Sequence, residues 1–586
     1  MRDLKMACCL AFCLVLYLFI SMTATVAANP DSKALFPRSH NSSSGKVLIH
    51  GPSISAWDQF RQLSGSTRIE VTAAGGSQTW NGTASFKADT VVNLESRQVA
   101  LERRHISSMK FAGGAAPENI QALAREALSK GLQSVPLDHV LRSLPKDFNI
   151  PDQAKALPQL NFEPPRIVVS NKPTRLMLID GPPAYGPIDG MEMEFVVNTD
   201  WTVFHHPRED SWYILDDGHW LTNNMLSSGS WISTNELPRD FLTLQVNSDW
   251  PEVAAAMPPR KSEAPPLPLI LSYEPSELVL IDGDMKLEPI GDGGLEYVTN
   301  TRNALFKLGG RFYLLASGRW FSTKNVKRKW YSVKTLPSEF AKIPEDHPRA
   351  YVLASVPGTP AARLAQIEAS IPRTAVVSLD AGNALEVPYV GEPSFVEIQG
   401  TGLRRAENTP FQVIMNNNFY YLCHDGAWFS SSDPRGPWKT AREVPEAIYT
   451  IPPTDPAFNV TFVRLDSFDD SSGEVAYQST SGYYSRYWTG SSMVYGTGWY
   501  YPGYHNRSVY WRYPHTYGYG YGAWGPYYPY SYNYSATYEV NRPDKDWQWD
   551  LDGNKRAVYD YGPRNYIGGG TYVMPKSDNH KAGGKQ

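Results

Sequence analysis

Cysteine is almost absent from this chain. Its 586 residues include only 4 cysteines, and three of them, Cys8, Cys9 and Cys13, lie close to the N-terminus. If this N-terminal segment is removed, Cys423 is left alone and cannot form a disulfide within the chain. Secreted eukaryotic domains commonly depend on disulfides, so their absence favours a bacterial exported protein.

Excess charge and long hydrophobic runs are scarce as well. The chain has 55 basic and 59 acidic residues, a net charge of −4, which leaves no electrostatic footprint for nucleic acid. After residue 22 no stretch is apolar enough to span a membrane as a helix. P-loop, dinucleotide-binding, HExxH and GxSxG patterns are missing too. We therefore expect no nucleic-acid partner, no cofactor, no metal and no catalytic residues.

The first 28 residues are typical of a secretory signal peptide. Arg2 and Lys5 supply positive charge, residues 6–22 form an apolar core, and residues 26–28 are small enough for cleavage. An uncleaved membrane anchor is the alternative, because the apolar core approaches the length of a span. The chain is predicted to be exported to the periplasm, the cell surface or the medium, with no transmembrane span after cleavage.

Aromatic residues are what the chain has in excess, at 13% of all residues, with 17 Trp and 35 Tyr. One aromatic pattern occurs three times: a tyrosine, a glycine five residues later, a tryptophan two residues beyond it, and a second tryptophan ten or eleven residues further on. The copies are Tyr213, Gly218, Trp220 and Trp231; Tyr313, Gly318, Trp320 and Trp330; and Tyr421, Gly426, Trp428 and Trp438.

The similarity between the three copies extends further upstream. An Asn-Thr pair precedes each glycine, and LMLIDG at residues 176–181 matches LVLIDG at residues 278–283. The equivalent glycines are 100 and 108 residues apart. A repeat of about 100 residues is too long for a solenoid unit and has the size of a small domain.

The predicted fold class is mainly β with minor α, in several domains. Three tandem β-rich repeats of about 100 residues, at 165–250, 268–345 and 373–452, follow an α+β N-terminal domain at 46–150. The remaining segments are a mobile linker at 29–45, a β segment at 458–511, a Tyr/Gly-rich low-complexity tract at 512–540 and a C-terminal tail at 541–586.

Local signals predict several individual elements. Alternating or β-rich stretches predict strands at 68–71, 77–86, 97–103 and 105–111, and apolar spacing predicts helices at 118–132 and 137–144. Thr359 and Pro360 form an N-cap followed by proline at the first helical position, which predicts a helix start. Gly309 and Gly310 predict a hairpin turn.

The repeated aromatic residues allow two interpretations. An exposed ring can stack on the apolar C–H face of a sugar, whereas a buried ring would form the core of a small β domain. We expect at least one Trp of each pair to be core, with Trp231, Trp330 and Trp438 as anchors. The turn indoles are the better surface candidates. The candidate carbohydrate-binding residues are therefore Trp220, Trp320, Trp428, Tyr213, Tyr313 and Tyr421.

The other repeated positions are expected to be structural. Gly218, Gly318 and Gly426 are predicted to adopt positive φ in turns. The Asn-Thr pairs are predicted to brace turns through hydrogen bonds from their side chains to the backbone. Cys423 aligns with Leu215 and Leu315, so it is expected to be a buried apolar residue and not a nucleophile.

Acidic and histidine residues give little support for catalysis or metal binding. Asp180 and Asp282 could supply the two carboxylates of a glycoside hydrolase, but each adjoins a glycine and the third copy has Val390 instead. A turn-forming Asp-Gly is the favoured interpretation. His205–His206 with Glu209–Asp210 occurs in one repeat only, and its spacing matches no zinc pattern.

The order of these parts resembles a known family. Together with FYYLCHDGAWFSSSDPRGPW at 419–438 and VYGTGWYYPG at 494–503, it is similar to large bacterial secreted proteins labelled carbohydrate-binding family V/XII-like, over most of the chain after the signal. The resemblance implies glycan binding at the cell envelope. We expect an exported, non-catalytic polysaccharide-binding protein. The alternatives are a structural scaffold that binds envelope proteins and, third, a glycan hydrolase.

Overall fold

The structure is a computed structural model. It describes residues 36–94, 97–151, 160–179, 182–183, 185–188, 190–196, 199, 201–216, 218–227, 230–245, 251–260, 262, 265–301, 303–387, 389, 392–407, 409, 411–484, 486–489, 492–499 and 571–573. The fold is mainly β with a smaller helical part, as predicted. The predicted signal peptide, the predicted Tyr/Gly-rich tract and, apart from 571–573, the predicted C-terminal tail lie outside the described residues.

The described residues form two compact units. The first contains 36–52, 66–85 and 106–132, and the second contains 53–65, 86–105 and the rest of the chain from residue 133. One sheet has the order β1-β2-β4-β5-β6-β7, with β3 paired to β4. Its strands are β1 (Arg38–Ser42), β2 (Gly45–Ile49), β3 (Ser53–Asp58), β4 (Gln62–Ala73), β5 (Thr79–Asn93), β6 (Gln98–Phe111) and β7 (Ser134–Pro136).

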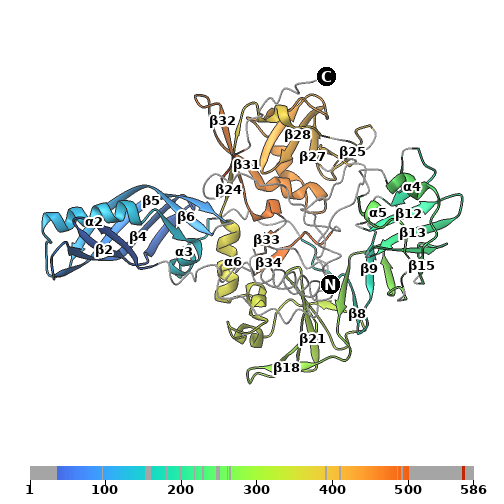
Figure 1. The fold of residues 1–586 in the computed structure, drawn as a ribbon, viewed down its shortest axis with the longest axis horizontal. Helices are drawn as coiled ribbons and strands as arrows, with labels where there is room; N and C mark the ends of the chain where they lie inside the picture. Colours follow the sequence, from blue (N-terminus) through green and yellow to red (C-terminus); the bar gives the residue numbers. More distant parts are fainter. Residues whose placement is uncertain are drawn as a thin grey trace, which may run out of the picture. The chain divides into compact units, whose positions relative to one another are not determined.

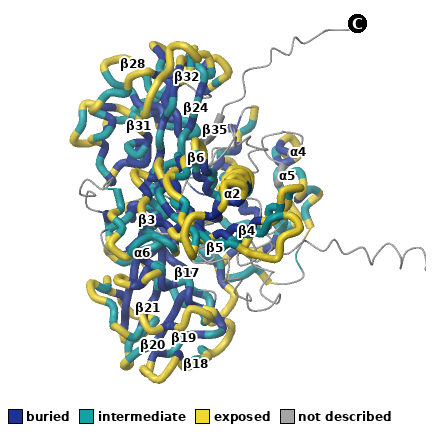
Figure 2. The backbone as a smooth tube through the Cα atoms, turned by 90° about the vertical axis from the view of Figure 1, so that its left-hand side faces the viewer, coloured by how far each residue is buried: buried dark blue, intermediate teal, exposed yellow. Residues whose placement is uncertain are grey.

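The core of the first unit lies between a helix and strands. Helix α2 (Glu118–Gly131) confirms the helix predicted at 118–132, and it lies along β2 and β4 in Figure 1. Its apolar residues recur every three or four positions and so share one face. That face packs against strand side chains such as Val47 and Val71, while the opposite face is exposed in Figure 2.

Residues 38–45 correct the prediction of a mobile linker at 29–45. Strand β1 pairs with β2 from Arg38↔Ile49 to Ser42↔Gly45. The Ser42 hydroxyl accepts a hydrogen bond from Ser44 N at 3.2 Å, and Arg38 Nη1 donates to Gly131 O at 3.0 Å. The serine-rich composition therefore belongs to a hairpin turn, because Ser side chains stabilise turns as well as occurring in linkers.

Three six-stranded antiparallel sheets make up much of the second unit, each with its strands in chain order. The first sheet contains β10 (Tyr185–Pro187), β11 (Glu194–Val196), β12 (Thr202–His206), β13 (Ser211–Asp216), β14 (His219–Asn223) and β15 (Ile232–Thr234). The second contains β18 (Leu287–Ile290), β19 (Leu295–Val298), β20 (Ala304–Leu308), β21 (Arg311–Ala316), β22 (Arg319–Thr323) and β23 (Tyr331–Ser332). The third contains β25 (Phe395–Glu397), β26 (Arg404–Ala406), β27 (Gln412–Asn416), β28 (Phe419–His424), β29 (Ala427–Ser431) and β30 (Lys439–Thr440).

The turn between the fourth and fifth strands contains a glycine with positive φ in all three sheets. The positive φ predicted for its glycines is confirmed, at 77° for Gly218, 75° for Gly318 and 75° for Gly426. Ser317 and Asp425 precede two of these glycines, and both have a φ of 48°. Two successive residues with positive φ match the twist of the flanking strands. The Gly309-Gly310 hairpin, with φ of 54° and 76°, is also confirmed.

Side chains alternate between the two faces of the first sheet, and other segments of the chain pack on both faces. Helices α4 (Asp240–Gln245) and α5 (Pro251–Ala255) lie on the face that carries Phe204, Tyr213 and Trp220. On the other face, strands β9 (Arg175–Leu178) and β16 (Leu269–Ser272) supply residues that pack with Ile214 and Leu221. A sheet that is buried on both sides needs apolar residues at successive positions, as in the run Trp212–Leu215.

Strands that precede the first and second sheets pair with each other. Strand β8 (Arg166–Ser170) is parallel to β17 (Ser276–Leu280), from Arg166↔Ser276 to Ser170↔Leu280. Strand β9 is parallel to β16, from Arg175↔Leu269 to Leu178↔Ser272. These two pairings were not predicted from the sequence.

The remaining described elements include two further sheets. One has the order β31-β32-β24-β35, and the other pairs β33 with β34. The strands are β24 (Arg373–Ser378), β31 (Val463–Asp469), β32 (Glu474–Ser479), β33 (Arg486–Trp488), β34 (Met493–Tyr495) and β35 (Thr571–Val573). The 3-10 helices are η2 (Ser338–Lys342), η3 (Ala350–Ser355), η4 (Ala381–Ala384), η5 (Glu446–Thr450), η6 (Pro456–Phe462) and η7 (Ser481–Tyr484).

Two further predicted helices are present. Helix α3 (Leu137–Ser143) forms where a helix was predicted at 137–144. Helix α6 (Pro360–Ser370) begins after the predicted N-cap, because Thr359 Oγ1 accepts a hydrogen bond from Ala362 N at 3.1 Å.

A buried arginine fixes the turn of the second sheet. The Arg319 side chain donates to Asn161 O, Tyr495 O and Gly496 O, each at 2.8 Å, and the residue is only 1% exposed. A Cβ added at Gly318 would lie 2.2 Å from Met493 O, so backbone packs directly against backbone here. The corresponding positions of the other sheets hold His219 and Ala427.

We predict that Arg319→Met destabilises the second unit by about 2–4 kcal/mol, because several buried carbonyl groups lose their donor. Calorimetric unfolding should show a melting temperature lowered by several degrees. The matched control is Arg328→Met, since Arg328 is exposed. Equal melting temperatures for the two variants would contradict the role given to Arg319.

Candidate functional site

The structure buries all six repeated tryptophans. Among the turn indoles, Trp220 and Trp428 are 0% exposed and Trp320 is 7% exposed. Trp231, Trp330 and Trp438 are buried too. The expectation that at least one Trp of each pair is core is therefore confirmed. The expectation that the turn indoles are exposed is wrong.

The tyrosines that precede the turns are also largely covered. Tyr213 and Tyr313 are buried, and Tyr421 is half-buried. Burial, followed by a hydrogen bond to Glu209, raises the pKa of Tyr213 to about 12. None of the six candidate residues therefore presents a fully exposed ring to a ligand.

Each turn indole is covered by the segment that follows its own sheet, and it donates a hydrogen bond to a backbone carbonyl group of that segment. Trp220 Nε1 donates to Ala256 O at 3.4 Å, Trp320 Nε1 to Ser355 O at 2.8 Å, and Trp428 Nε1 to Val463 O at 2.9 Å. An indole N–H can be buried at low cost only when it finds such an acceptor.

An apolar residue three positions after a proline completes this packing. Phe241 and Phe340 lie edge-on to Trp220 and Trp320, each with ring centroids 4.9 Å apart. The third sheet has the buried Ile448 at the same spacing from its proline. This Pro-x-x-Phe/Ile spacing is the sequence signal that could have predicted the burial.

The predicted role of the Asn-Thr pairs in bracing turns is confirmed where they are described. Thr199 Oγ1 donates to Leu178 O at 2.6 Å, and Thr301 Oγ1 to Leu280 O at 2.6 Å. Asn300 Nδ2 donates to Asp282 O at 2.7 Å. Asn198, Asn408 and Asp180 lie outside the described residues.

Cys423 is buried as predicted, at 3% exposure. Burial raises the pKa of its thiol well above the ordinary value, which disfavours the reactive thiolate. Across the described ranges, no group of three or more His, Cys, Asp or Glu could hold a metal ion. In the same part of the chain, no helix is long and apolar enough to cross a membrane.

Other aromatic residues, two of them exposed, gather at the first sheet and the segment after β16. We call Tyr185, His205, Trp212 and Tyr273 the aromatic cluster. The His205 and Trp212 rings are stacked, with centroids 4.3 Å apart and an interplanar angle of 23°. Tyr185 lies 5.7 Å from Trp212 and 5.9 Å from His205. Tyr185 is 45% exposed and Tyr273 is 44% exposed, whereas Trp212 is 8% exposed and packs in a hydrophobic core. The tyrosine rings are therefore the part of this cluster that is open to solvent.

The strand register brings the cluster together. His205 pairs with Trp212 on one side and with Glu194 on the other, and Glu194 Oε2 lies 3.5 Å from His205 Nδ1. Burial, then Tyr273 and Glu194, raise the pKa of Tyr185, so its hydroxyl keeps its proton. The surface therefore combines flat apolar rings with a carboxylate and phenol groups beside them.

The cluster was missed because Trp212 and Tyr213 are neighbours on one strand. Alternation sends neighbouring side chains to opposite faces. Tyr213, the predicted candidate, lies on the face that α4 and α5 cover, whereas Trp212 lies on the other face with His205 and Tyr185. In the third sheet, Phe395 and Tyr420 lie 5.4 Å apart, near the corresponding register. The second sheet places Leu287 there, so it lacks the pair of rings.

Comparisons with known proteins found no match. No family model fits the chain, and no curated protein or solved structure was found to be similar to it. The resemblance to carbohydrate-binding family V/XII-like proteins therefore stays a prediction.

The carboxyl group of Glu277, on β17, is buried and lies outside the aromatic cluster. Glu277 is 2% exposed. Its Oε1 accepts a hydrogen bond from Asn303 Nδ2 at 3.2 Å, and its Oε2 has no partner among the described residues. Burial raises the pKa of Glu277 well above its ordinary value of 4.5. The folded protein therefore holds this proton more tightly than the unfolded chain.

We predict that Glu277→Gln makes stability less dependent on pH. Because the pKa is raised on folding, the contribution of Glu277 is present at low pH and is lost as pH rises above about 4.5. A tenfold difference in proton affinity between the folded and unfolded states is worth about 1.4 kcal/mol. Melting temperatures from about pH 5 to 8 should fall less for the variant than for the wild type. The exposed neighbour Glu274 supplies the control, Glu274→Gln, which should keep the wild-type profile.

Proposed function

We propose that this chain is an exported, non-catalytic protein of the bacterial cell envelope that binds polysaccharide through the aromatic cluster of its first sheet. We also propose that the three sheets are copies of one repeat of about 100 residues. In this proposal the repeats supply a rigid support, and only the first copy carries the described binding surface.

The observation that carries the proposal is the exposed Tyr185 ring beside the stacked His205 and Trp212. The exposed Tyr273 is near enough to Tyr185 to raise its pKa. The C–H face of a pyranose ring is apolar and flat, so it can pack on such rings. Sugar hydroxyl groups can bond to the Glu194 carboxylate, which is partly exposed, and to the phenol groups. A chain of linked sugars presents such faces repeatedly, which favours a polysaccharide over a single sugar.

The proposal of a common repeat rests on matching strand register. Leu215↔Trp220, Leu315↔Trp320 and Cys423↔Trp428 are equivalent pairs. The turn indole of each sheet also bonds to a carbonyl 35 or 36 residues further along the chain. These common features are core features, so the repetition of aromatic residues does not require three ligand sites.

Retention on insoluble polysaccharide tests the binding surface. The Tyr185→Ala, Tyr273→Ala double variant should bind chitin or purified peptidoglycan about tenfold more weakly, because two stacking rings are lost. The measurement is the bound fraction in a pull-down over a range of polysaccharide concentrations. Soluble sugar released in the same assay would instead indicate a hydrolase.

The matched control is Tyr331→Ala, since Tyr331 is 55% exposed but lies on the second sheet. This control should keep wild-type retention. The proposal is contradicted if wild-type protein is not retained on either polymer, or if the double variant, with an unchanged melting temperature, is retained as well as the control.

A protein scaffold is the second candidate, and the burial of all six repeated indoles favours it. These residues are fully explained by folding, so they no longer argue for a sugar ligand. In this alternative the repeats and the Tyr-rich tract bind other envelope proteins.

Deletion of residues 513–586 separates the two candidates. A scaffold that binds through this tract should lose its co-purifying envelope proteins, while any retention on polysaccharide should remain. Quantitative affinity purification of the full-length and shortened chains measures the difference. Unchanged partner recovery from the shortened chain would count against a scaffold that depends on the tract.

A further inference from the structure

A carboxylate lies among the rings of the aromatic cluster, on the same face of the first sheet. Residues that pair directly or diagonally across neighbouring strands share a face. Glu194 pairs with His205, and His205 pairs with Trp212. Tyr185 pairs with Val196, two residues from Glu194. In strand order, this face therefore carries Tyr185, Glu194, His205 and Trp212.

The Glu194 carboxylate is partly exposed, and histidine is its ion-pair partner. The Glu194 side chain is 40% exposed, and its Oε2 lies 3.5 Å from His205 Nδ1. Histidine is charged only when it is protonated, whereas Lys and Arg stay charged over the ordinary pH range. Across the part of the chain that the structure describes, neither a Lys nor an Arg forms an ion pair with Glu194. Its negative charge therefore remains available to a ligand.

The corresponding positions of the other two sheets have different charges. Strand register places Glu296 of the second sheet at the position of Glu194 and Lys307 at the position of His205. Lys307 Nζ lies 3.5 Å from Glu296 Oε2, so that carboxylate has a lysine partner. In the third sheet, Arg404 occupies the position of Glu194. Among the described residues of the three sheets, only the first sheet thus places a carboxylate without a Lys or Arg partner at this position.

We propose that the aromatic cluster binds an amino sugar, whose ammonium group lies against the Tyr185 ring and the Glu194 carboxylate. The face of an aromatic ring attracts cations, and groups of aromatic rings recognise quaternary ammonium ligands. Tyr185 is 45% exposed, and contacts with His205 and Trp212 at 5.9 and 5.7 Å hold its ring in place. The carboxylate adds an attraction that a neutral sugar does not receive. This inference rests on the proposed function, because it names the class of sugar that the same site takes.

The surroundings of Tyr185 also disfavour an acidic sugar. Burial, then Tyr273 and Glu194, raise the pKa of Tyr185. These influences make negative charge at the phenol less favourable, and Glu194 would likewise repel the carboxylate of a uronic acid. We therefore expect affinity to fall in the order cationic, neutral, acidic polymer.

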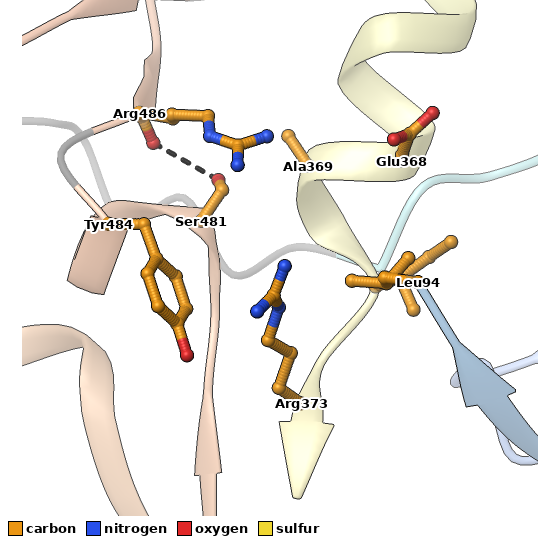
Figure 3. A pocket seen from close by; sticks show the side chains of 8 residues that line it. Leu94, Glu368, Ala369, Arg373, Ser481, Tyr484 and Arg486 are labelled. Carbon is orange, nitrogen blue, oxygen red and sulfur yellow. Dashed lines mark hydrogen bonds between the residues drawn. The ribbon is translucent and has the colours of Figure 1, made fainter. Parts of the chain in front are cut away.

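A second carboxylate beside aromatic and charged side chains, shown in Figure 3, does not offer the same chemistry. The hollow drawn there lies between the C-terminal end of α6 and the strands β24 and β33. Its open space is about 20 Å³, which holds about one water molecule. Its carboxylate, Glu368, accepts hydrogen bonds from Arg97 at 3.1 and 3.2 Å. The ammonium group of a sugar would therefore find neither room nor an unpaired carboxylate in this hollow.

Three sugar oligomers of equal length test the inference. They are tetramers of N-acetylglucosamine, which is neutral, of N,N,N-trimethylglucosamine, which is cationic at every pH, and of galacturonic acid, which is anionic. Calorimetric titration of the full chain at about pH 8 should show the cationic tetramer binding about tenfold more tightly than the neutral one. The anionic tetramer should bind most weakly. Added sodium chloride should reduce these differences, because salt screens partly exposed charges.

The Glu194→Gln variant tests the carboxylate itself. Its affinity for the cationic tetramer should fall about tenfold, and that for the neutral tetramer only about twofold, because the glutamine oxygen still accepts hydrogen bonds. The matched control is Glu296→Gln, at the same register of the second sheet, which should keep all three wild-type affinities. Melting temperatures of both variants establish that they are folded.

The outcomes separate this inference from the proposed function. Equal wild-type affinity for the neutral and cationic tetramers, or an unchanged preference in folded Glu194→Gln, would overturn the inference and leave polysaccharide binding in place. Binding of none of the tetramers would contradict the proposed function as well. The wild-type preference and its dependence on salt need no variant, so they decide the matter even if Glu194→Gln folds poorly.

Discussion

Burial of an indole N–H is the constraint on which the three sheets depend. A buried polar group is costly unless it is hydrogen-bonded, and each turn indole finds its acceptor in the chain that follows its own sheet. The bond fixes where that following segment must pack. The three segments differ in local structure, since the first is helical at α4 and α5 while the others contain 3-10 helices. The acceptor position therefore matters more than the type of helix that supplies it.

Sequence patterns predicted the features that short stretches of chain decide. The turn glycines, the Thr359 N-cap and helix α2 all depend on residues within a few positions of each other, and all are confirmed. Exposure of the turn indoles depends on distant residues such as Phe241 and Phe340. The Tyr-x4-Gly-x-Trp pattern fixes a hairpin register, but it does not say which face of the sheet other segments will cover.

Differences between equivalent positions of the three sheets mark contacts that belong to one sheet. His219 and Ala427 stand where the second sheet has Arg319, and only that sheet has its turn tied to residues 495 and 496 by a guanidinium group. The parallel pairing of β8 with β17 joins the segments that precede the first and second sheets. Such long-range contacts do not recur along the sequence, so the repeated pattern does not predict them. The available signal for the contacts of Arg319 was that it differs from the residues at the equivalent positions of the sequence pattern.

Differences between the sheets at surface positions limit how the chain could bind a polymer. Where the first sheet stacks His205 on Trp212 beside Glu194, the second sheet has Lys307 at the register of His205, with its Nζ 3.5 Å from Glu296 Oε2. Core positions are alike in these two sheets, but these surface positions are not. Avidity multiplies affinity only when linked sites can engage the same ligand together. Polysaccharide binding by the described residues would therefore be a single-site interaction, even though the aromatic pattern occurs three times.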